Sequence, residues 1–266
     1  MGNEQRSDGT FRALLRFWRS QRGMSQLDLG LAADVSARHI SFLETGRSRP
    51  SIEMVGLLGE VLDVPLRNRN ELLRAAGFEP SYPEPSLDEL LASPLGEAID
   101  AMLKHSEPYP LMVVDRWYRL VQTNSGGRKL LSLAGADLEL EPNLNLLTIL
   151  FDPELRPAVS NWDEVAGQIL RRLQRSVLRQ PDSEELNQLL ADLLATPGLP
   201  EHWRVPDLSG PNDPMVSMEI GIGDIRLRLL MTLTVFHAPN NVTLEELQLE
   251  SYFPLDDATR EFFVNP

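Results

Sequence analysis

The chain of 266 residues is long enough for one large domain or two ordinary ones, and its 42% hydrophobic residues suffice for a packed core. It contains no cysteine, which excludes disulfides, cysteine-ligated metals and a cysteine nucleophile. No run of 18 apolar residues predicts a membrane span, and the polar start MGNEQRSDGT is not typical of a secretory signal. These features favour a cytoplasmic protein.

The net charge of −14 is unevenly distributed along the chain. Residues 1–80 hold 11 Arg, no Lys and 10 acidic residues, and residues 10–49 hold seven Arg against three acidic residues. Residues 81–266 hold 14 basic and 29 acidic residues. Because an acidic surface repels phosphate, we expect any nucleic-acid contact to be confined to the N-terminal region.

The first 78 residues predict five helices separated by short turns, of which the one between the second and third helices is Asp34-Val35. Ser25, Ser36 and Ser51 each precede an expected helix and are good N-caps, whereas Gly46 is a good helix end. The expected helices cover about residues 10–22, 25–32, 36–44, 51–62 and 66–76.

The third of these helices has two distinct faces. Ile40 and Leu43 are three residues apart and therefore share a buried face. The side chains that point elsewhere include an Arg, a Ser and a small residue, which suit base recognition in the DNA major groove. These outward residues are Ala37, Arg38, Ser41 and Phe42.

The segment SQLDLGLAADVSARHISFLETGRSR resembles the phage-repressor-like, or XRE-type, helix-turn-helix family. The resemblance implies an all-α, five-helix domain over residues 8–78 that binds double-stranded DNA. It also implies these DNA-binding residues: Gln26, Ser36, Ala37, Arg38, His39, Ser41, Phe42, Thr45 and Arg47. Gly30 departs from the family pattern, and we expect it to weaken its helix slightly. The alternative is a plain helical bundle with a solvated arginine face.

The segment EPSYPEPS at residues 79–86 contains three prolines and predicts a short, semi-rigid linker. The remaining residues, 87–266, alternate between helical and strand-like patterns. Helices are expected over 87–104, 124–133, 161–179 (capped by Asn161), 183–195 and 256–263, and residues 143–156 are expected to hold a Leu-rich helical turn. Strands are expected over 111–115, 118–124, 215–222, 225–237 and 243–254.

Two strands, a set of helices and then three strands is the order of an α+β, PAS-like domain with a five-stranded antiparallel sheet. The segments EPYPLMVVDRWYRLVQTN, NLLTILFDPELRP and ESYFPLDDAT, with NWDEVA, resemble the MmyB-like transcription regulators. That family has an XRE-type domain followed by a PAS-like ligand-binding domain. The resemblance implies that the second domain holds an apolar small molecule of fatty-acyl character, such as a bound fatty acid.

A pocket between the expected helices and sheet would be lined by Leu146, Leu150, Phe151, Trp162, Ile169, Leu233 and Phe236. Plain core packing is the alternative at each of these positions, because buried apolar residues are the default. Arg156 is the preferred anchor for a ligand carboxylate, although a structural clamp on a loop explains it equally well. Other candidate anchors are Asn161, Arg226, Arg228 and His237.

The sequence contains no nucleophile elbow, metal-binding histidine pair or phosphate-binding glycine loop, so we expect no enzyme, no metal site and no cofactor. We expect a one-component bacterial transcriptional regulator, cytoplasmic and nucleoid-associated. It would act as a homodimer on an inverted-repeat operator, without a membrane partner. One alternative is a DNA-binding regulator whose second domain only dimerises or binds a protein partner. The other is an enzyme with a fused DNA-binding module.

Overall fold

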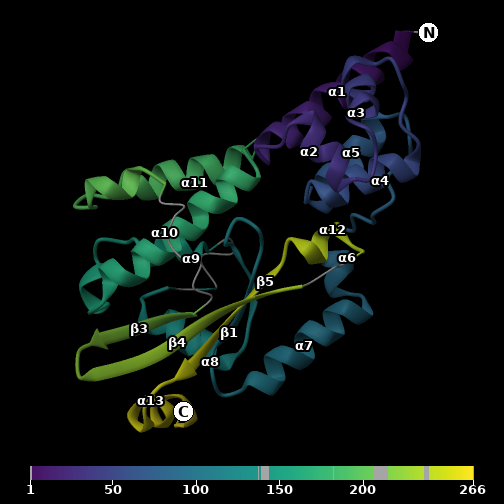
Figure 1. Cartoon of the computed structure of the whole chain (residues 1–266). Helices are drawn as coiled ribbons and strands as arrows, with labels where there is room; N and C mark the ends of the chain where they lie inside the picture. Colours follow the sequence, from purple (N-terminus) through teal and green to yellow (C-terminus); the bar gives the residue numbers. More distant parts are fainter. Residues whose placement is uncertain are drawn as a thin grey trace. The chain divides into compact units, whose positions relative to one another are not determined.

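The computed structural model describes residues 2–136, 138, 144–181, 183–206, 215–236 and 240–265, with side chains described from residue 10 onward. The chain forms two compact units (Figure 1). The helical unit comprises residues 1–89 and 238–245, and the sheet unit comprises residues 90–237 and 246–266. None of the described helices combines the length and the apolar character that crossing a bilayer demands.

The helical unit contains the five predicted helices in the predicted order. They are α1 (Gly2–Gln21), α2 (Gln26–Ala32), α3 (Ala37–Thr45), α4 (Ile52–Val61) and α5 (Leu66–Ala75). Phe11, Leu15 and Trp18 of α1 are buried in one apolar cluster with Ile40 and Leu43 of α3. This core fixes which face of α3 is left at the surface.

The helix boundaries follow from the capping residues. Ser25, Ser36 and Ser51 each accept a backbone N–H bond from the third residue of the following helix. Gly46 ends α3 in the left-handed conformation at φ 74°. Gly30 was expected to weaken α2, but a Cβ there would lie 2.8 Å from the carbonyl oxygen of Val35, so this glycine permits the close approach of the α2–α3 turn.

The predicted linker is held against α5 by side-chain bonds within the helical unit. Asn70 is fully buried, and its Oδ1 accepts from the backbone N–H groups of Ser81 and Tyr82. Glu84 accepts from Asn70 at 2.6 Å and also pairs with Arg74 at 3.3 Å. Residues 81–84 are therefore fixed to α5 and form part of the helical unit, so they do not act as a linker between the units.

A segment far along the chain also belongs to the helical unit. The predicted strand over 243–254 is wrong at its start, where residues Val242–Glu245 form a short helix, α12. The Thr243 hydroxyl donates to the Pro85 carbonyl, and a carboxylate oxygen of Glu245 accepts from the Leu66 N–H at 2.8 Å. Because Pro65 has no side-chain acceptor to cap α5, Glu245 supplies the acceptor from elsewhere in the sequence.

The sheet unit is built on the predicted five-stranded antiparallel sheet, in the order β2-β1-β5-β4-β3. Its strands are β1 (Leu111–Val114), β2 (Leu120–Thr123), β3 (Met215–Ile222), β4 (Ile225–Val235) and β5 (Gln248–Pro254). The short strand β1 lies between β2 and the central strand β5, so the first and last strands of the unit pair with each other inside the sheet.

One predicted helix of this unit is divided in the structure. The helix expected over 87–104 is two helices, α6 (Leu87–Leu91) and α7 (Pro94–Ser106), because Pro94 provides no N–H to continue a helix but suits a first turn. The Leu-rich helical turn expected within 143–156 is α9 (Leu146–Leu150), and the 3-10 helix η1 (Arg156–Ala158) follows it.

The remaining helices agree with the expected segments, with small changes at their ends. They are α8 (Ser125–Leu133), α10 (Trp162–Arg179), α11 (Glu184–Leu194), the 3-10 helix η2 (Glu201–Arg204) and α13 (Asp257–Val264). Asn161 was expected to cap α10, but its amide instead accepts from the Glu219 N–H and donates to the Ser217 carbonyl. It therefore ties the start of α10 to β3.

One face of the sheet carries the main apolar core of the unit. Strand pairing places Met231 opposite both Val216 and Tyr252, and places Glu250 opposite Met112, so these side chains share a face. Helices α8, α9 and α10 contribute buried residues to the same core. Strand β1 is buried along its whole length, and α7 contacts it as well (Figure 1).

Candidate DNA-binding surface and ligand pocket

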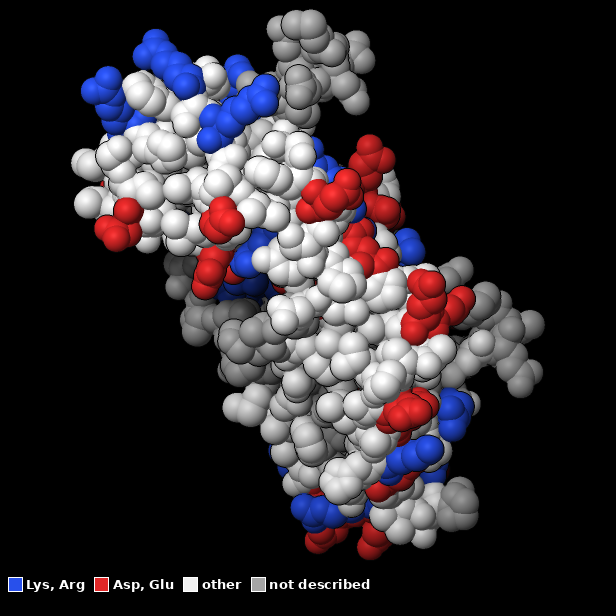
Figure 2. Space-filling model, turned by 90° about the vertical axis from the view of Figure 1, so that its right-hand side faces the viewer, with Lys and Arg blue, Asp and Glu red and all other residues white. Residues whose placement is uncertain are grey.

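Helix α3 presents the predicted outward face. Ile40 and Leu43 are buried in the core of the helical unit, whereas Arg38 is exposed and Ala37 and Ser41 are half-buried. Figure 2 shows Lys and Arg side chains gathered on one end of the helical unit. An exposed helix with Arg and small residues beside basic side chains has the geometry that major-groove recognition requires.

Phe42 links two of the predicted DNA-binding residues. The guanidinium of Arg38 lies 5.1 Å from the centre of the Phe42 ring, and that of Arg47 lies 5.8 Å from it. Cation–π contacts of this kind restrict the rotamers of a long side chain. Phe42 thus orients both guanidiniums, a role that differs from a direct base contact.

The hydroxyl groups of the predicted surface are already used to build α3. The Ser36 side chain accepts from the His39 N–H, and the Thr45 hydroxyl donates to the Ser41 carbonyl at 2.7 Å. Ser36, Thr45 and Arg47 are exposed, and His39 is half-buried. All of these residues lie on α3, at its N-cap or just after its end, and their contacts with DNA stay predictions.

Gln26 has a structural partner that sequence reasoning missed. Its side-chain amide donates to Glu44 at 2.8 Å, and the same carboxylate accepts from Arg19 at 2.6 Å and lies 3.8 Å from Arg16. The Glu44 side chain is 1% exposed. Burial raises its pKa, but the Arg19 and Gln26 hydrogen bonds and the arginine charges outweigh burial, so the pKa of Glu44 lies below its ordinary value.

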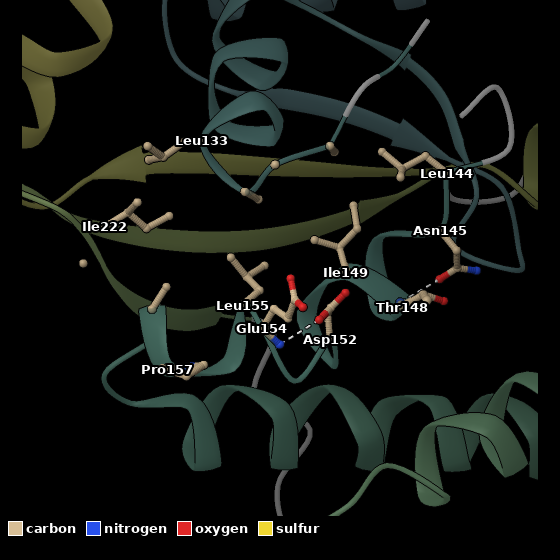
Figure 3. Close-up of a pocket in the computed structure, with 15 residues that line it drawn as sticks. Leu133, Leu144, Asn145, Thr148, Ile149, Asp152, Glu154, Leu155, Pro157 and Ile222 are labelled. Carbon is tan, nitrogen blue, oxygen red and sulfur yellow. Dashed lines mark hydrogen bonds between the residues drawn. The ribbon is translucent and has the colours of Figure 1, made fainter. Parts of the chain in front are cut away.

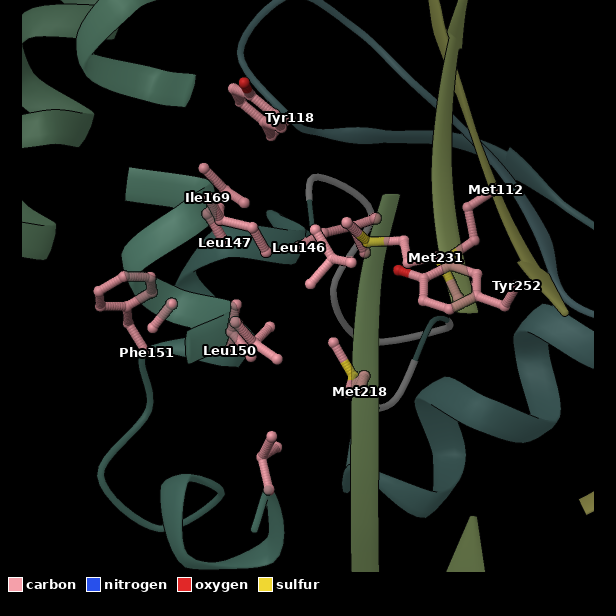
Figure 4. Close-up of a cluster of buried hydrophobic side chains, with 14 of the residues drawn as sticks. Met112, Tyr118, Leu146, Leu147, Leu150, Phe151, Ile169, Met218, Met231 and Tyr252 are labelled. Carbon is pink, nitrogen blue, oxygen red and sulfur yellow. The ribbon is translucent and has the colours of Figure 1, made fainter. Parts of the chain in front are cut away.

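A partly open apolar cavity of about 80 Å³ lies in the sheet unit. Figure 4 shows the sheet side of this region, with Met112, Met218 and Tyr252, facing Leu146 and Leu150 of α9. The residues around this inner cavity are Met112, Leu130, Leu131, Leu133, Ala134, Leu146, Ile149, Leu150, Leu155, Val159, Met218, Ile220, Ile222 and Tyr252. Tyr252 supplies the one polar side chain of this lining among the described residues.

The structure brings only some of the predicted ligand residues to the inner cavity. Leu146 and Leu150 line it. Phe151, Trp162 and Ile169 belong to the surrounding core, where Trp162 donates its indole N–H to the Leu150 carbonyl. Two further predicted residues are half-buried outside the lining: Leu233 on β4 and Phe236 just beyond it.

The predicted anchors lie away from the cavity lining. The guanidinium of Arg156 stacks over the Trp162 ring at 4.0 Å and lies 3.5 Å from the Asp163 carboxylate, as a clamp on a loop would. Arg226 and Arg228 alternate with the core-facing residues of β4 and so occupy the opposite face of the sheet. His237 lies outside the described residues.

The inner cavity adjoins a larger, open hollow of about 1010 Å³ on the same unit. Leu133, Ala134, Ile149, Leu155 and Ile222 line both spaces, which are therefore continuous. Figure 3 shows this outer hollow, with polar side chains from α9 and from the residues on either side of it. They include Asn145, Thr148, Asp152 and Glu154.

A buried polar pair adjoins the apolar cavity. The Tyr252 hydroxyl donates to the Glu250 carboxylate at 2.9 Å, and Glu250 is 4% exposed. Burial is the main cause that raises the pKa of Glu250, and it also raises the pKa of Tyr252 together with the charge of Glu250. Sequence reasoning missed this pair because residues 243–254 read as one uniform strand.

The missed lining residues had a partial signal in the sequence. In MVSMEIGI the apolar residues Met218, Ile220 and Ile222 alternate, which identifies one strand face. No sequence pattern, however, places that face against α8 and α9.

The comparison with known families assigns both units. A model of the MmyB-like transcription regulator ligand binding domain matches residues 95–263, and a helix-turn-helix model matches residues 15–67. The first match covers more than half of the chain. No curated protein matches the sequence.

Proposed function

This chain belongs to the MmyB-like transcription regulator family, as a DNA-binding regulator with a ligand-sensing domain, and we propose that its ligand is an apolar molecule with a fatty-acyl chain. The observation that carries the proposal is the inner cavity, which is lined by aliphatic and Met side chains and one tyrosine. Flexible methionines such as Met112 and Met218 adapt to a chain of variable shape.

The volumes indicate how such a chain would lie. Small-molecule pockets typically measure about 300–1,000 Å³, whereas the inner cavity measures about 80 Å³. The cavity therefore holds the end of a chain, and the rest of the molecule extends into the outer hollow. A fatty acid would supply such a chain, with its tail inside.

Regulation by this ligand follows from linkage. A ligand changes operator affinity only to the extent that it binds two conformations of the protein unequally. Strand β5 contributes Tyr252 to the cavity, and the chain immediately before β5, residues 240–245, is packed into the helical unit. This connection supports a one-component regulator, in which one chain both senses the ligand and binds the operator.

A pair of Leu→Trp variants tests the pocket. Leu150 lines the inner cavity, whereas Leu170 of α10 is buried in the surrounding core and does not. Overpacking a filled core typically costs about 1–3 kcal/mol, so Leu170→Trp should destabilise the unit by that amount and Leu150→Trp by clearly less. Thermal melts with and without dodecanoate or 1-dodecanol measure both effects.

The ligand response completes this test. At a ligand concentration about 100 times Kd, the wild type and Leu170→Trp should gain about 2.7 kcal/mol, and Leu150→Trp should gain nothing. A wild type that responds to neither compound, with both variants equally destabilised, would make the second domain an interaction module without a ligand.

We also propose that the regulator acts as a homodimer on an inverted-repeat operator, in the cytoplasm and at the nucleoid. One helix-turn-helix reads only a few base pairs, so two copies are needed for a specific site, with half-sites about one helical turn apart. Leu27 and Leu31 of α2 are 58% and 73% exposed, so the helical unit has apolar surface of its own.

Sedimentation velocity at micromolar protein, with and without operator DNA, measures the assembly state. A dimer on DNA is expected, with two protected half-sites in a footprint. A monomer in both conditions, protecting a single half-site, would contradict the proposal.

A further inference from the structure

Residues 242–247, which we call the connecting segment, carry the chain from the helical unit into the sheet unit. Helix α12 occupies the first four of these residues, and β5 begins at Gln248 (Figure 1). The boundary between the two compact units falls between Glu245 and Glu246. Two neighbouring carboxylates therefore belong to different units, and each has a partner within its own unit.

The first part of the connecting segment is fixed to the helical unit. The Val242 N–H donates to the Pro83 carbonyl at 2.9 Å, and the Val242 side chain is fully buried. A carboxylate oxygen of Glu245 accepts from the Leu66 N–H at 2.8 Å, in the first turn of α5. The N–H groups of a first turn have no partner within their own helix, so Glu245 caps α5 from 179 residues away in the sequence.

The last part of the connecting segment is fixed to the sheet unit. The Glu246 carboxylate lies 2.8 Å from the guanidinium of Arg116, in the turn between β1 and β2, and the two side chains are only 18% and 19% exposed. Arg116 also lies over the Trp117 ring at 4.2 Å, which restricts the position of its guanidinium. Leu247 is buried. The connecting segment thus has an anchor on each side of the boundary and no free length between them.

Strand β5 connects the second anchor to the inner cavity. Because β5 pairs with β1 on one side and with β4 on the other, its residues do not shift independently of the sheet. Tyr252 follows Glu246 by six residues, lines the cavity and donates to the buried Glu250. At about 3.3 Å per residue, roughly 20 Å of strand separates the two sites. A displacement of β5 at the cavity therefore reaches Glu245 through a paired strand.

We propose that the connecting segment transmits ligand binding to the DNA-binding unit, with the Glu245 cap on α5 and the Arg116–Glu246 pair as its two anchors. This inference rests on the proposed function, since it names how the ligand-sensing domain regulates operator binding. Leu72 and Leu73 of α5 belong to the same apolar core as Ile40 of α3. A change at the cap of α5 therefore changes the support of the helix that faces DNA.

The strength of a helix cap limits the size of this coupling. A side-chain cap typically changes the equilibrium of helix formation by about 2- to 30-fold. Because the cap is the link between the two sites, the coupling between ligand and operator should lie in the same range. By reciprocity, operator DNA changes the affinity for the ligand by the factor by which the ligand changes the affinity for operator DNA.

Dodecanoate is the probe, and titration calorimetry on the full-length protein measures its Kd with and without a duplex of the selected operator. In the wild type the two Kd values should differ by about 2- to 30-fold. In Glu245→Ala they should be equal because the cap is lost. Glu245→Gln should keep the difference, since its amide oxygen still accepts from the Leu66 N–H. Arg116→Ala should equalise the two Kd values while the Leu66 N–H keeps its protection from hydrogen exchange.

Glu71→Ala and Arg119→Ala are the matched controls. Glu71 is an exposed residue of the same helix α5, and Arg119 lies over the Trp117 ring at 4.8 Å, as Arg116 does at 4.2 Å. Each control removes the same charge as its test variant but leaves both anchors in place, so the wild-type difference in Kd should remain. Loss of the difference in either control would overturn the specific role of the anchors.

The remaining outcomes separate this proposal from the proposed function. If the difference in Kd survives in Glu245→Ala or in Arg116→Ala, or if the wild type shows none, the transmission is wrong and the ligand pocket stands. Because Arg116 lies in the sheet unit, its variant decides the result even if Glu245→Ala no longer binds the operator. If dodecanoate does not bind the wild type at all, the proposed pocket fails, and the transmission fails with it.

Discussion

Replacing Glu44 with Ala should destabilise the helical unit by about 3 kcal/mol or more. Breaking a buried ion pair typically costs about 3–5 kcal/mol, and the lower end is expected here because the Arg19 side chain is 14% exposed and keeps some contact with water. The substitution leaves Arg19 and the Gln26 amide without their acceptor. Hydrogen exchange across α2 and α3 measures the loss in the full-length protein. Operator binding should fall with it, since α3 is held by the same contacts.

The Glu44 carboxylate should also make the stability of the helical unit depend on pH. The pKa of Glu44 is lower in the folded protein than its ordinary value. The contribution of Glu44 to the free energy of unfolding is therefore complete above about pH 4.3 and is lost as the pH falls through the folded pKa. Glu44→Gln should remove this part of the acid sensitivity, because an amide does not titrate in this range.

Glu60→Ala is the matched control, since Glu60 is an exposed residue of α4 in the same unit. Surface substitutions usually change stability by no more than about 0.5 kcal/mol. If Glu44→Ala stays within the range of this control, the network around Glu44 does not stabilise the unit. If Glu44→Gln keeps the acid transition of the wild type, another group causes it.

Replacing Arg38 with Ala should weaken binding to the selected operator by about 1–3 kcal/mol and relax the preference at one base pair. Arg38 is exposed near the start of α3, where side chains reach base edges, and the Phe42 ring holds its guanidinium. Affinities for the operator, selected from a random pool, and for single-base variants of it provide the measurement.

Arg47→Ala should act differently. Arg47 follows the end of α3, so its loss should lower the affinity for all sequences evenly and reduce the salt slope by about one unit. Phe42→Leu should show both effects weakly, because the ring contacts both guanidiniums.

Arg204→Ala removes the same charge from the sheet unit and should leave operator binding unchanged. Equal and sequence-independent losses for Arg38→Ala and Arg47→Ala would contradict the assignment of Arg38 to base recognition.

The elements of this protein were predictable where local chemistry dominates. Ser25, Ser36 and Ser51 cap the helices that they precede, and Gly46 ends α3, because each of these residues acts on its own backbone neighbours. The strand patterns of the sheet unit and its five-stranded sheet followed in the same way. Errors arose at Pro94, which divides a helix, and at residues 242–245, whose helix is formed by contacts with the helical unit.

The sequence by itself determined the two-part organisation, the helix-turn-helix and the exposed face of α3, since the caps mark the helix ends and the spacing of Ile40 and Leu43 identifies the face that must be buried. Tertiary structure decided the ligand site. Met112, Met218 and Tyr252 come from three strands, and they meet α9 only when the strands have paired and α9 has packed against the sheet. It also decided that Gln26 binds the buried Glu44 and that Arg156 stacks on Trp162. These contacts join residues distant in sequence, and neither periodicity nor composition encodes which partners a buried side chain will meet.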